Sequence, residues 1–176
     1  MKRSAYQPPQ VPEGWSIRTG RPEDWEAAAA LERACFPPAG AADPERIRDR
    51  LKHFPDCFWL LFCGDRLVSM VDGMATDQED LTDDLYADAS LHAPDGDWQM
   101  LFGVCTAPDM RGRGCAGLLL GRVLSDSARR DRKGVVLTCK DALVPFYARF
   151  GFFNEGRTEK SCHGNAVWNQ MRVTFL

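Results

Sequence analysis

The sequence lacks a long apolar run. Its longest is the CFWLLFC segment at 57–63, far below the roughly 18 to 20 residues that a membrane-spanning helix needs. The opening residues, MKRSAYQPPQVP, include two basic side chains but no apolar stretch behind them. They fit a loose arm over residues 1–13 better than a signal peptide. We therefore expect a protein that does not enter a membrane.

Clustered metal ligands and a surplus of basic residues are also missing. The seven cysteines are odd in number and contain no C-x-x-C pair, and the three histidines are scattered along the chain. This argues against zinc and against a disulfide framework, and it favours a reducing cytoplasm. The formal net charge of −3 argues against nucleic acid as the main partner, because nucleic-acid binding usually requires a basic face.

Lysine and arginine are absent from residues 67–110, and this gap carries many acids. Two interpretations stand side by side: a solvated, mobile acidic loop, or an acidic rim over residues 77–97 that attracts a cationic substrate. The acidic residues of the gap are Asp72, Asp77, Glu79, Asp80, Asp83, Asp84, Asp88, Asp95, Asp97 and Asp109.

With 176 residues, 44% of them apolar and 27% charged, the chain fits one folded domain over residues 14–176. Helices are expected at 22–35, at 44–54 after an Asp43 cap, from Gly114 onward, and after an Asp141 cap. In the helix from Gly114 the spacing turns Arg122, Ser125 and Asp126 away from the core. Strands are expected at 16–19, 57–63, 66–76, 97–106, 135–139, 152–157 and 166–175. The fold class is therefore mixed α/β.

The stretch from Leu101 to Asp126, LFGVCTAPDMRGRGCAGLLLGRVLSD, organises the chain. It is typical of a buried strand, a proline-marked turn, a glycine-rich loop with two arginines, and an amphipathic helix that begins at the loop. The first N–H groups of such a helix have no partner within it, and the helix dipole favours negative charge there. We interpret the loop as a pyrophosphate site.

Two segments carry a resemblance to a known family. RGRGCA at 111–116 fits R-x-x-G-x-A, and LTCKDALVPFYARFGF follows at 137–152. They resemble the acetyl-CoA motif and the C-terminal helix of the GNAT superfamily of N-acetyltransferases, and the second is especially similar to the arylalkylamine (serotonin-type) enzymes. The resemblance implies a GNAT fold, with a central splayed mixed sheet of about seven strands and about four helices. It also implies acetyl-CoA as the donor and no metal.

The resemblance also assigns residues to the donor. The backbone of Val104, Cys105 and Thr106 would pair with pantetheine, and the Cys105 N–H would stabilise the oxyanion. Tyr147 would lie beside the sulfur as general acid. At the far end of the helix, Arg129, Arg130, Arg132 and Lys133 either meet the 3′-phosphate or complement the helix dipole. The pyrophosphate would be wrapped by Arg111, Gly112, Arg113, Gly114, Cys115 and Ala116.

The acceptor side departs from the resembled family. Arylalkylamine enzymes carry an H-x-H pair before the motif, but the matching positions here are Met100 and Phe102. Neither side chain can accept a proton, so the acceptor assignment does not transfer. His163 and His92 are the replacement bases we consider first, with Asp97 acting through water and Glu155 as further candidates. We expect Asp97, Met100, Phe102 and His92 to border the acceptor.

The function that these features predict is direct transfer of an acetyl group to a primary amine, small and cationic. The alternatives are a protein lysine or N-terminal acetyltransferase, and a sensor module that binds acyl-CoA without transferring it. Cys105 and Cys139 are expected near the cleft, so an alternative is a ping-pong reaction through an acetyl-cysteine intermediate. Neither cysteine has a histidine or acid beside it in a recognisable arrangement. A homodimer is possible on this fold.

Overall fold

The computed structural model describes residues 2–162 and 166–176, whose core is a seven-stranded mixed sheet. Its order is β1-β2-β3-β4-β5-β7-β6, with β4 and β5 the only parallel neighbours among the pairs described. The sheet confirms the expected mixed α/β fold and strand number. The strands are β1 (Trp15–Thr19), β2 (Phe58–Cys63), β3 (Arg66–Thr76), β4 (Trp98–Thr106), β5 (Gly134–Cys139), β6 (Phe153–Thr158) and β7 (Trp168–Thr174).

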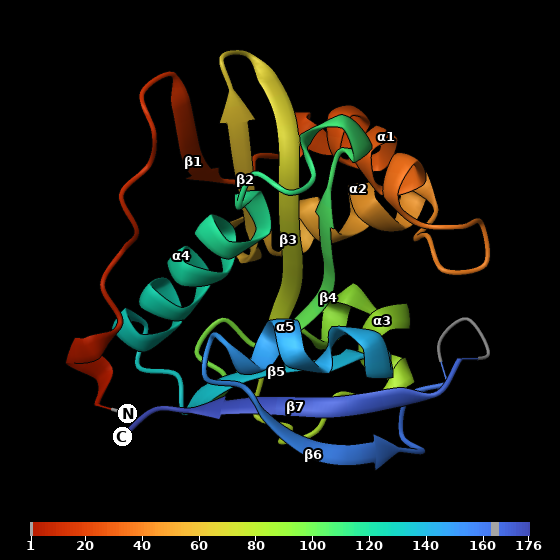
Figure 1. Ribbon diagram of the computed structural model, residues 1–176. Helices are drawn as coiled ribbons and strands as arrows, with labels where there is room; N and C mark the ends of the chain where they lie inside the picture. The colour runs from red at the N-terminus through yellow and green to blue at the C-terminus, as the bar shows by residue number, and fades with distance from the viewer. Residues whose placement is uncertain (1, 163–165) are drawn as a thin grey trace.

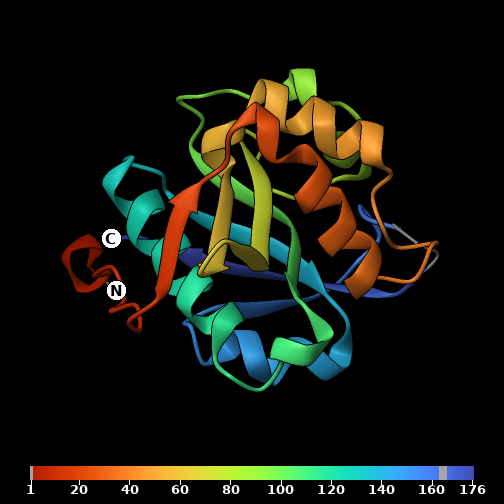
Figure 2. The same ribbon diagram turned by 90° about the horizontal axis from the view of Figure 1, so that it is seen from above.

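Helices cover both faces of the sheet. Figures 1 and 2 show α1 and α2 on one face of β2–β4 and α4 on the other. None of the described helices is long and apolar enough to cross a membrane. The helices are α1 (Trp25–Cys35), α2 (Pro44–His53), α3 (Asp83–Ala87), α4 (Cys115–Arg129) and α5 (Val144–Ala148). Asp43 caps α2 as expected, because its side chain accepts the Arg46 N–H at 2.9 Å.

The sheet splits between β4 and β5. The two strands pair only from Trp98↔Gly134 to Leu101↔Leu137. Beyond this point β4 pairs with β3 alone, and β5 pairs with β7 alone. The split coincides with a bulge, since Leu101 lies opposite Gly73 while Gly103 lies opposite Asp72. The extra residue, Phe102, bends β4 away from β5.

Residues 77–97 include ordered elements, which differs from the mobile loop that was one interpretation of their charge. They contain α3 and a short 3₁₀ helix, Ala89–Leu91. Two of their carboxylates are bound by residues far away in the chain: Asp80 pairs with Arg172 at 2.7 Å, and Asp83 accepts the Cys162 N–H at 3.0 Å. These bonds tie the acidic segment to β7 and to the end of β6. The sequence pattern gave no indication of these partners because they lie about 80 to 90 residues away.

The first residues are held against the rest of the chain. The Arg3 N–H donates to Leu176 O at 3.2 Å, and the Arg3 guanidinium donates to Ala128 O at the end of α4. The rings of Tyr6 and Phe175 meet edge to face with centroids 4.9 Å apart. The two ends of the chain consequently lie side by side (Figure 1).

Two local expectations are wrong. Asp141 does not cap a helix: a 3₁₀ turn covers Asp141–Leu143 before α5 begins, and the Asp141 carboxylate instead accepts from Asn169 Nδ2 at 2.6 Å. Ser125 and Asp126 do not face solvent but are buried. The start of the chain packs on α4, and β2 contacts it as well, so both cover a side that helical spacing alone leaves open.

Asp126 joins α4 to the sheet. Its carboxylate accepts from Trp59 Nε1 at 2.9 Å and from Arg122 Nε at 3.0 Å, and it is also bonded to Arg129. Burial alone would raise the pKa of Asp126, but the bonds from Trp59, Arg129 and Arg122 outweigh burial and lower it. The carboxylate is therefore stabilised in its charged form.

We predict that Asp126→Asn lowers the free energy of unfolding at pH 7 by about 2 kcal/mol, because it removes the charge that two guanidinium groups share. The folded-state pKa is below the unfolded value of about 3.9, so this stabilisation is present above that pH and is lost as pH falls through the folded pKa. Urea unfolding at pH 7 and about pH 3 measures both. Asp131→Asn, at an exposed carboxylate beyond the same helix, is the control; equal costs for the two variants would contradict the prediction.

Candidate active site

Two cavities meet where β4 and β5 separate. The loop cavity, of about 650 Å³, runs along the glycine-rich loop and the start of α4. The inner cavity, of about 360 Å³, lies between α1, β4 and the end of β5. The residues shared by both linings form the junction: Cys35, Phe36, Val104, Leu143 and Tyr147.

The loop cavity contains nearly all of the residues expected to hold the donor. Of those expected, Arg113 alone is missing from the lining and is exposed. Gly112 and Gly114 have φ values of +77° and +78°, a left-handed conformation that glycine adopts without strain. No atom lies within 4 Å of a Cβ built at either position. The open cradle and the start of the fifteen-residue helix α4 fit a pyrophosphate.

The loop is held by side chains that precede it. Arg66 and Asp109 form a two-pronged ion pair with both N–O distances 2.7 Å, which fixes the turn before the loop. Arg111 Nε donates to Thr106 O at 3.3 Å, so this side chain folds back on the end of β4. Arg113 makes no such bond among those described, and its charge is available at the rim.

The alternation of β4 decides which backbone groups face the split. Ala107 N–H donates to Val68 O on β3, and Ser69 Oγ donates to Cys105 O, each at 2.8 Å. Alternate residues of a strand direct their backbone to the same side. Cys105 therefore directs its N–H to β3, which is a correction to its expected oxyanion role. Val104 and Thr106 direct theirs to the side that β5 has left.

Tyr147 stands at the junction of the cavities. It is 6% exposed, and the rings of Phe146 and Phe152 meet it edge to face at 5.1 and 5.9 Å. Burial, with smaller contributions from Cys139 and Cys105, raises the pKa of its hydroxyl. The hydroxyl therefore stays protonated at neutral pH and is available to donate.

Cys35, which the sequence analysis did not single out, also lies at the junction. Its Sγ is 3.2 Å from Thr106 O. The hydrogen bond from Cys105 and the nearby Arg111 guanidinium lower the pKa of Cys35 to about 7. In the same pair the pKa of Cys105 is raised, and burial raises that of Cys139 to about 11. Neither cysteine considered for an acetyl-cysteine route is thus an activated thiol.

Charged side chains from three elements meet at the buried end of the inner cavity. Arg50 on α2 donates to Asp72 Oδ2 on β3 at 3.0 Å and to Tyr86 O at 3.0 Å. Glu32 on α1 accepts the Ala42 N–H at 3.1 Å through Oε1, while its buried Oε2 has no hydrogen-bond partner among the described groups. Burial and the charge of Asp72 raise the pKa of Glu32 to about 7.

Glu32 could have been found in the sequence. Ala28, Ala29 and Cys35 are three or four residues from it, so helical spacing places Glu32 on the apolar face of α1. A charged residue on such a face indicates a buried partner or a site. Arg50, next to Leu51, and Asp72, inside an apolar strand, carry the same signal.

The expected acceptor residues are not brought together. Phe102 lines the inner cavity, with its ring 4.5 Å below the Arg50 guanidinium. Met100 is fully buried in the core, and Asp97 forms an ion pair with Lys133 at 2.7 Å at the opposite end of β4. Neither lines either cavity. His163 lies outside the described residues.

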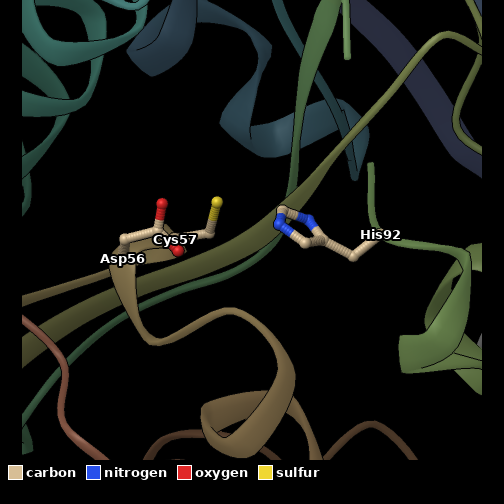
Figure 3. A group of neighbouring side chains, drawn as sticks. All are labelled: Asp56, Cys57 and His92. Atoms are coloured by element: carbon tan, nitrogen blue, oxygen red, sulfur yellow. The ribbon is translucent and has the colours of Figure 1, made fainter. Parts of the chain in front are cut away.

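His92 lies away from both cavities, beside Asp56 and Cys57 (Figure 3). The potential ligand atoms of these three are within 4.8 Å of one another, but they do not fit a cation. His92 Nδ1 accepts the Ala75 N–H at 3.1 Å, so the neutral ring carries its proton on Nε2 and has no free lone pair. Burial raises the pKa of Cys57 to about 12, which keeps it a thiol.

The other candidates are engaged elsewhere. Glu155 accepts from Arg172 Nε at 3.1 Å and is exposed on β6. Of the basic cluster at the end of α4, Arg130 donates to Asp56 O and Arg132 to Gly96 O. A fifteen-residue helix is about 22 Å long, so this cluster is far from the loop cavity. The structure therefore favours structural roles for it over contact with a 3′-phosphate.

Comparison with known proteins agrees with this architecture. Residues 25–152 match the Acetyltransferase (GNAT) family. The chain is 32% identical over 136 residues to serotonin N-acetyltransferase of Mesocricetus auratus, covering 74% of this chain and 64% of that enzyme. It thus spans less than two thirds of that relative.

Solved structures share the fold. The loading GNATL domain of CurA from Lyngbya majuscula superposes with a TM-score of 0.78 at 18% identity, covering 91% of this chain and 97% of that one. A GNAT acetyltransferase from Brucella melitensis, solved with acetyl-CoA, gives 0.60 at 15% identity, covering 92% and 88%. With the family match over most of its length, the split sheet and the glycine-rich loop at the start of α4, this chain belongs to the GNAT acetyltransferase family.

Proposed function

We propose that the protein is an acetyl-CoA-dependent N-acetyltransferase that transfers the acetyl group directly to a small primary amine. The observation that carries this proposal is the meeting of the loop cavity and the inner cavity at Tyr147. One cavity suits the donor and the other the acceptor, and the thioester would lie at their junction. The similarity to a serotonin N-acetyltransferase supports the same activity.

The donor would be held by groups on both sides of the junction. The backbone of Val104 and Thr106 faces the split and would pair with the pantetheine amides. The N–H groups at the start of α4, with Gly112 and Gly114, would bind the pyrophosphate. Acetyl-CoA supplies the acyl group as a thioester; the protein orients it and keeps water from the junction.

Tyr147 would donate a proton to the departing sulfur. A raised pKa makes an isolated tyrosine a poorer acid, and an ordinary thiol with pKa about 8.5 would gain little from it. Burial also raises the pKa of the Cys139 thiol, which lines the inner cavity with Tyr147, so a thiolate leaving on that side of the junction would be a stronger base than one in water. The two effects partly cancel, and transfer stays feasible.

The inner cavity favours a small acceptor with an apolar body. Its volume of about 360 Å³ is that of a small-molecule site. Five of its described lining residues are aromatic, and the acidic residues of 77–97 line neither cavity. We therefore infer that selection of a cation depends on the buried end of the cavity rather than on an acidic rim. The aromatic wall comprises Phe36, Tyr86, Phe102, Tyr147 and Trp168.

The deciding experiment follows thiol release from acetyl-CoA with phenethylamine, spermidine, kanamycin and a lysine peptide. We expect turnover to be fastest with phenethylamine. Tyr147→Phe is expected to lower kcat by about 10²-fold, the lower end for general acid catalysis, with acetyl-CoA affinity nearly unchanged. Fastest turnover of the peptide would favour a protein acetyltransferase. Donor binding without turnover on any amine would favour a sensor module.

Arg113→Glu is expected to weaken acetyl-CoA binding about tenfold or more, because it replaces an uncommitted cation at the rim of the loop cavity with an anion. Isothermal titration calorimetry measures the affinity. Arg157→Glu, at an exposed arginine on β6, controls for the change in overall charge. Equal affinity of the Arg113 variant and wild type would contradict the pyrophosphate assignment.

Cys35 provides a test of where the donor binds. The pKa of Cys35 is about 7, so much of it is thiolate at pH 7. We expect iodoacetamide to alkylate Cys35 at this pH faster than it alkylates the buried Cys105 and Cys139. Saturating acetyl-CoA should slow the alkylation at least tenfold. Peptide mapping by mass spectrometry measures each site, and the exposed Cys162 serves as the internal control, since its rate should not change. Unprotected labelling of Cys35 would place the donor elsewhere.

A further inference from the structure

Glu32 is an unsatisfied acid at the buried end of the inner cavity. The side chain is 5% exposed, and one of its oxygens, Oε2, is buried without a hydrogen-bond partner among the described groups. An unpaired carboxylate oxygen in such a place is costly unless something binds it. Because Glu32 lines the cavity, what binds it can be a ligand.

No cationic side chain among the described residues forms an ion pair with Glu32, so a bound cation could balance its charge. Arg50 is committed to Asp72 and to Tyr86 O, so it balances Asp72. The Glu32 carboxylate, once ionised, has no such partner. Other titratable or charged groups near this end are Cys35 on the same helix, Cys105 on β4, and Tyr86 and Tyr147, with Lys140 at the exposed rim of the cavity.

Gly103 on β4 leaves space for the carboxylates of Asp72 and Glu32. A Cβ at Gly103 would lie 2.9 Å from Asp72 Oδ1 and 3.7 Å from Glu32 Oε2. The absence of a side chain there lets both acids approach the β4 backbone. The next residue, Val104, lies at the junction of the two cavities. Glu32 Oε2 is thus beside the part of β4 that leads to the proposed thioester.

The other described bases do not reach this place. His92, Asp97 and Glu155 line neither cavity, and no described histidine does. Asp72 is bonded to Arg50 through Oδ2 and lines neither cavity. Among the described residues, Glu32 is the carboxylate that lines the inner cavity, and its Oε2 is buried without a hydrogen-bond partner.

We propose that Glu32 is the general base of this enzyme: its carboxylate binds the acceptor as an ammonium ion and takes a proton from it. The proposal rests on the proposed function. Glu32 passes that proton to solvent, the nitrogen bonds to the carbonyl carbon, and the C–S bond breaks. Tyr147 protonates the sulfur, and the second proton lost by the nitrogen restores Tyr147.

The acidity of Glu32 suits this role. An alkylammonium ion has a pKa near that of lysine, about 10.4, and an ordinary glutamate about 4.3. At about 7, Glu32 halves that gap, yet it is still largely ionised above neutral pH. Because the carboxylate is the active form, kcat/KM should rise as pH increases through about 7. Below that pH Glu32 becomes protonated and can no longer act as a base, so kcat/KM should fall.

The test compares Glu32→Gln with wild type, using whichever amine of the panel turns over fastest. We expect kcat to fall by about 10²- to 10⁴-fold while acetyl-CoA affinity changes less than about twofold. The rise of kcat/KM near pH 7 should disappear, leaving only the rise due to the amine itself. Glutamine has the same shape and can still accept the Ala42 N–H, so it isolates the loss of the base.

Two further variants make the result specific. Glu32→Asp keeps the carboxylate one methylene further back, and we expect it to restore part of the activity and the rise near neutral pH. Glu26→Gln, on an exposed position of the same helix, should match wild type. Thermal unfolding checks that each variant folds, and if Glu32→Gln does not, the pH profile of Glu32→Asp decides.

The failures of the two proposals are distinguishable. If wild type acetylates an amine and Glu32→Gln retains its rate and pH profile, the base assignment is overturned and the proposed function stands. A shift of the Glu32→Asp profile that merely follows its thermal stability would also overturn it. If wild type releases no thiol with any amine, both proposals fail together.

Discussion

The separation of β4 from β5 after Leu101 and Leu137 is the constraint on which the site depends. The backbone of a strand inside a sheet normally hydrogen-bonds to two neighbouring strands, but beyond this point β4 pairs with β3 alone. The bulge at Phe102 starts the separation, and Gly73 permits it, since a Cβ there would lie 1.7 Å from Met100 O. The same divergence opens the space that becomes the two cavities.

The site combines a polar side and an apolar side because different elements supply each. The loop and the start of α4 present glycine backbone and arginine at the surface, where a charged group keeps its hydration and has little desolvation cost. Five of the described aromatic residues line the inner cavity; the charges at its buried end come from α1, α2 and β3, and Lys140 lies at its exposed rim. Burial therefore acts on a small number of groups, raising the pKa of Glu32 and Tyr147 together.

Sequence patterns predicted the elements that obey local rules. The Asp43–Pro44 helix start, the Arg66–Thr76 strand and the glycine loop before α4 depend on neighbours in the chain, and they were found with accurate bounds. The Asp141 cap failed because Asn169, a residue of a distant strand, takes its carboxylate. The prediction that Ser125 and Asp126 face away from the core was wrong because the start of the chain covers that side of α4.

The acceptor side was less predictable for a related reason. The bases predicted from the sequence are two histidines, Asp97 and Glu155. The structure instead brings Glu32 from α1 beside Gly103 on β4. That proximity joins residues about 70 positions apart, and no local spacing encodes it. The signal that was present, a glutamate on the apolar face of a helix, indicates burial but does not say what the carboxylate faces.

The pairing of Arg3 with Leu176 at the ends of the chain has a consequence for assembly. Both ends lie next to the C-terminal end of α4, whereas the loop cavity lies at its other end. A second domain fused at either terminus would therefore attach about one helix length from the loop cavity. The two chain ends and the loop cavity thus lie at opposite ends of a single helix, α4.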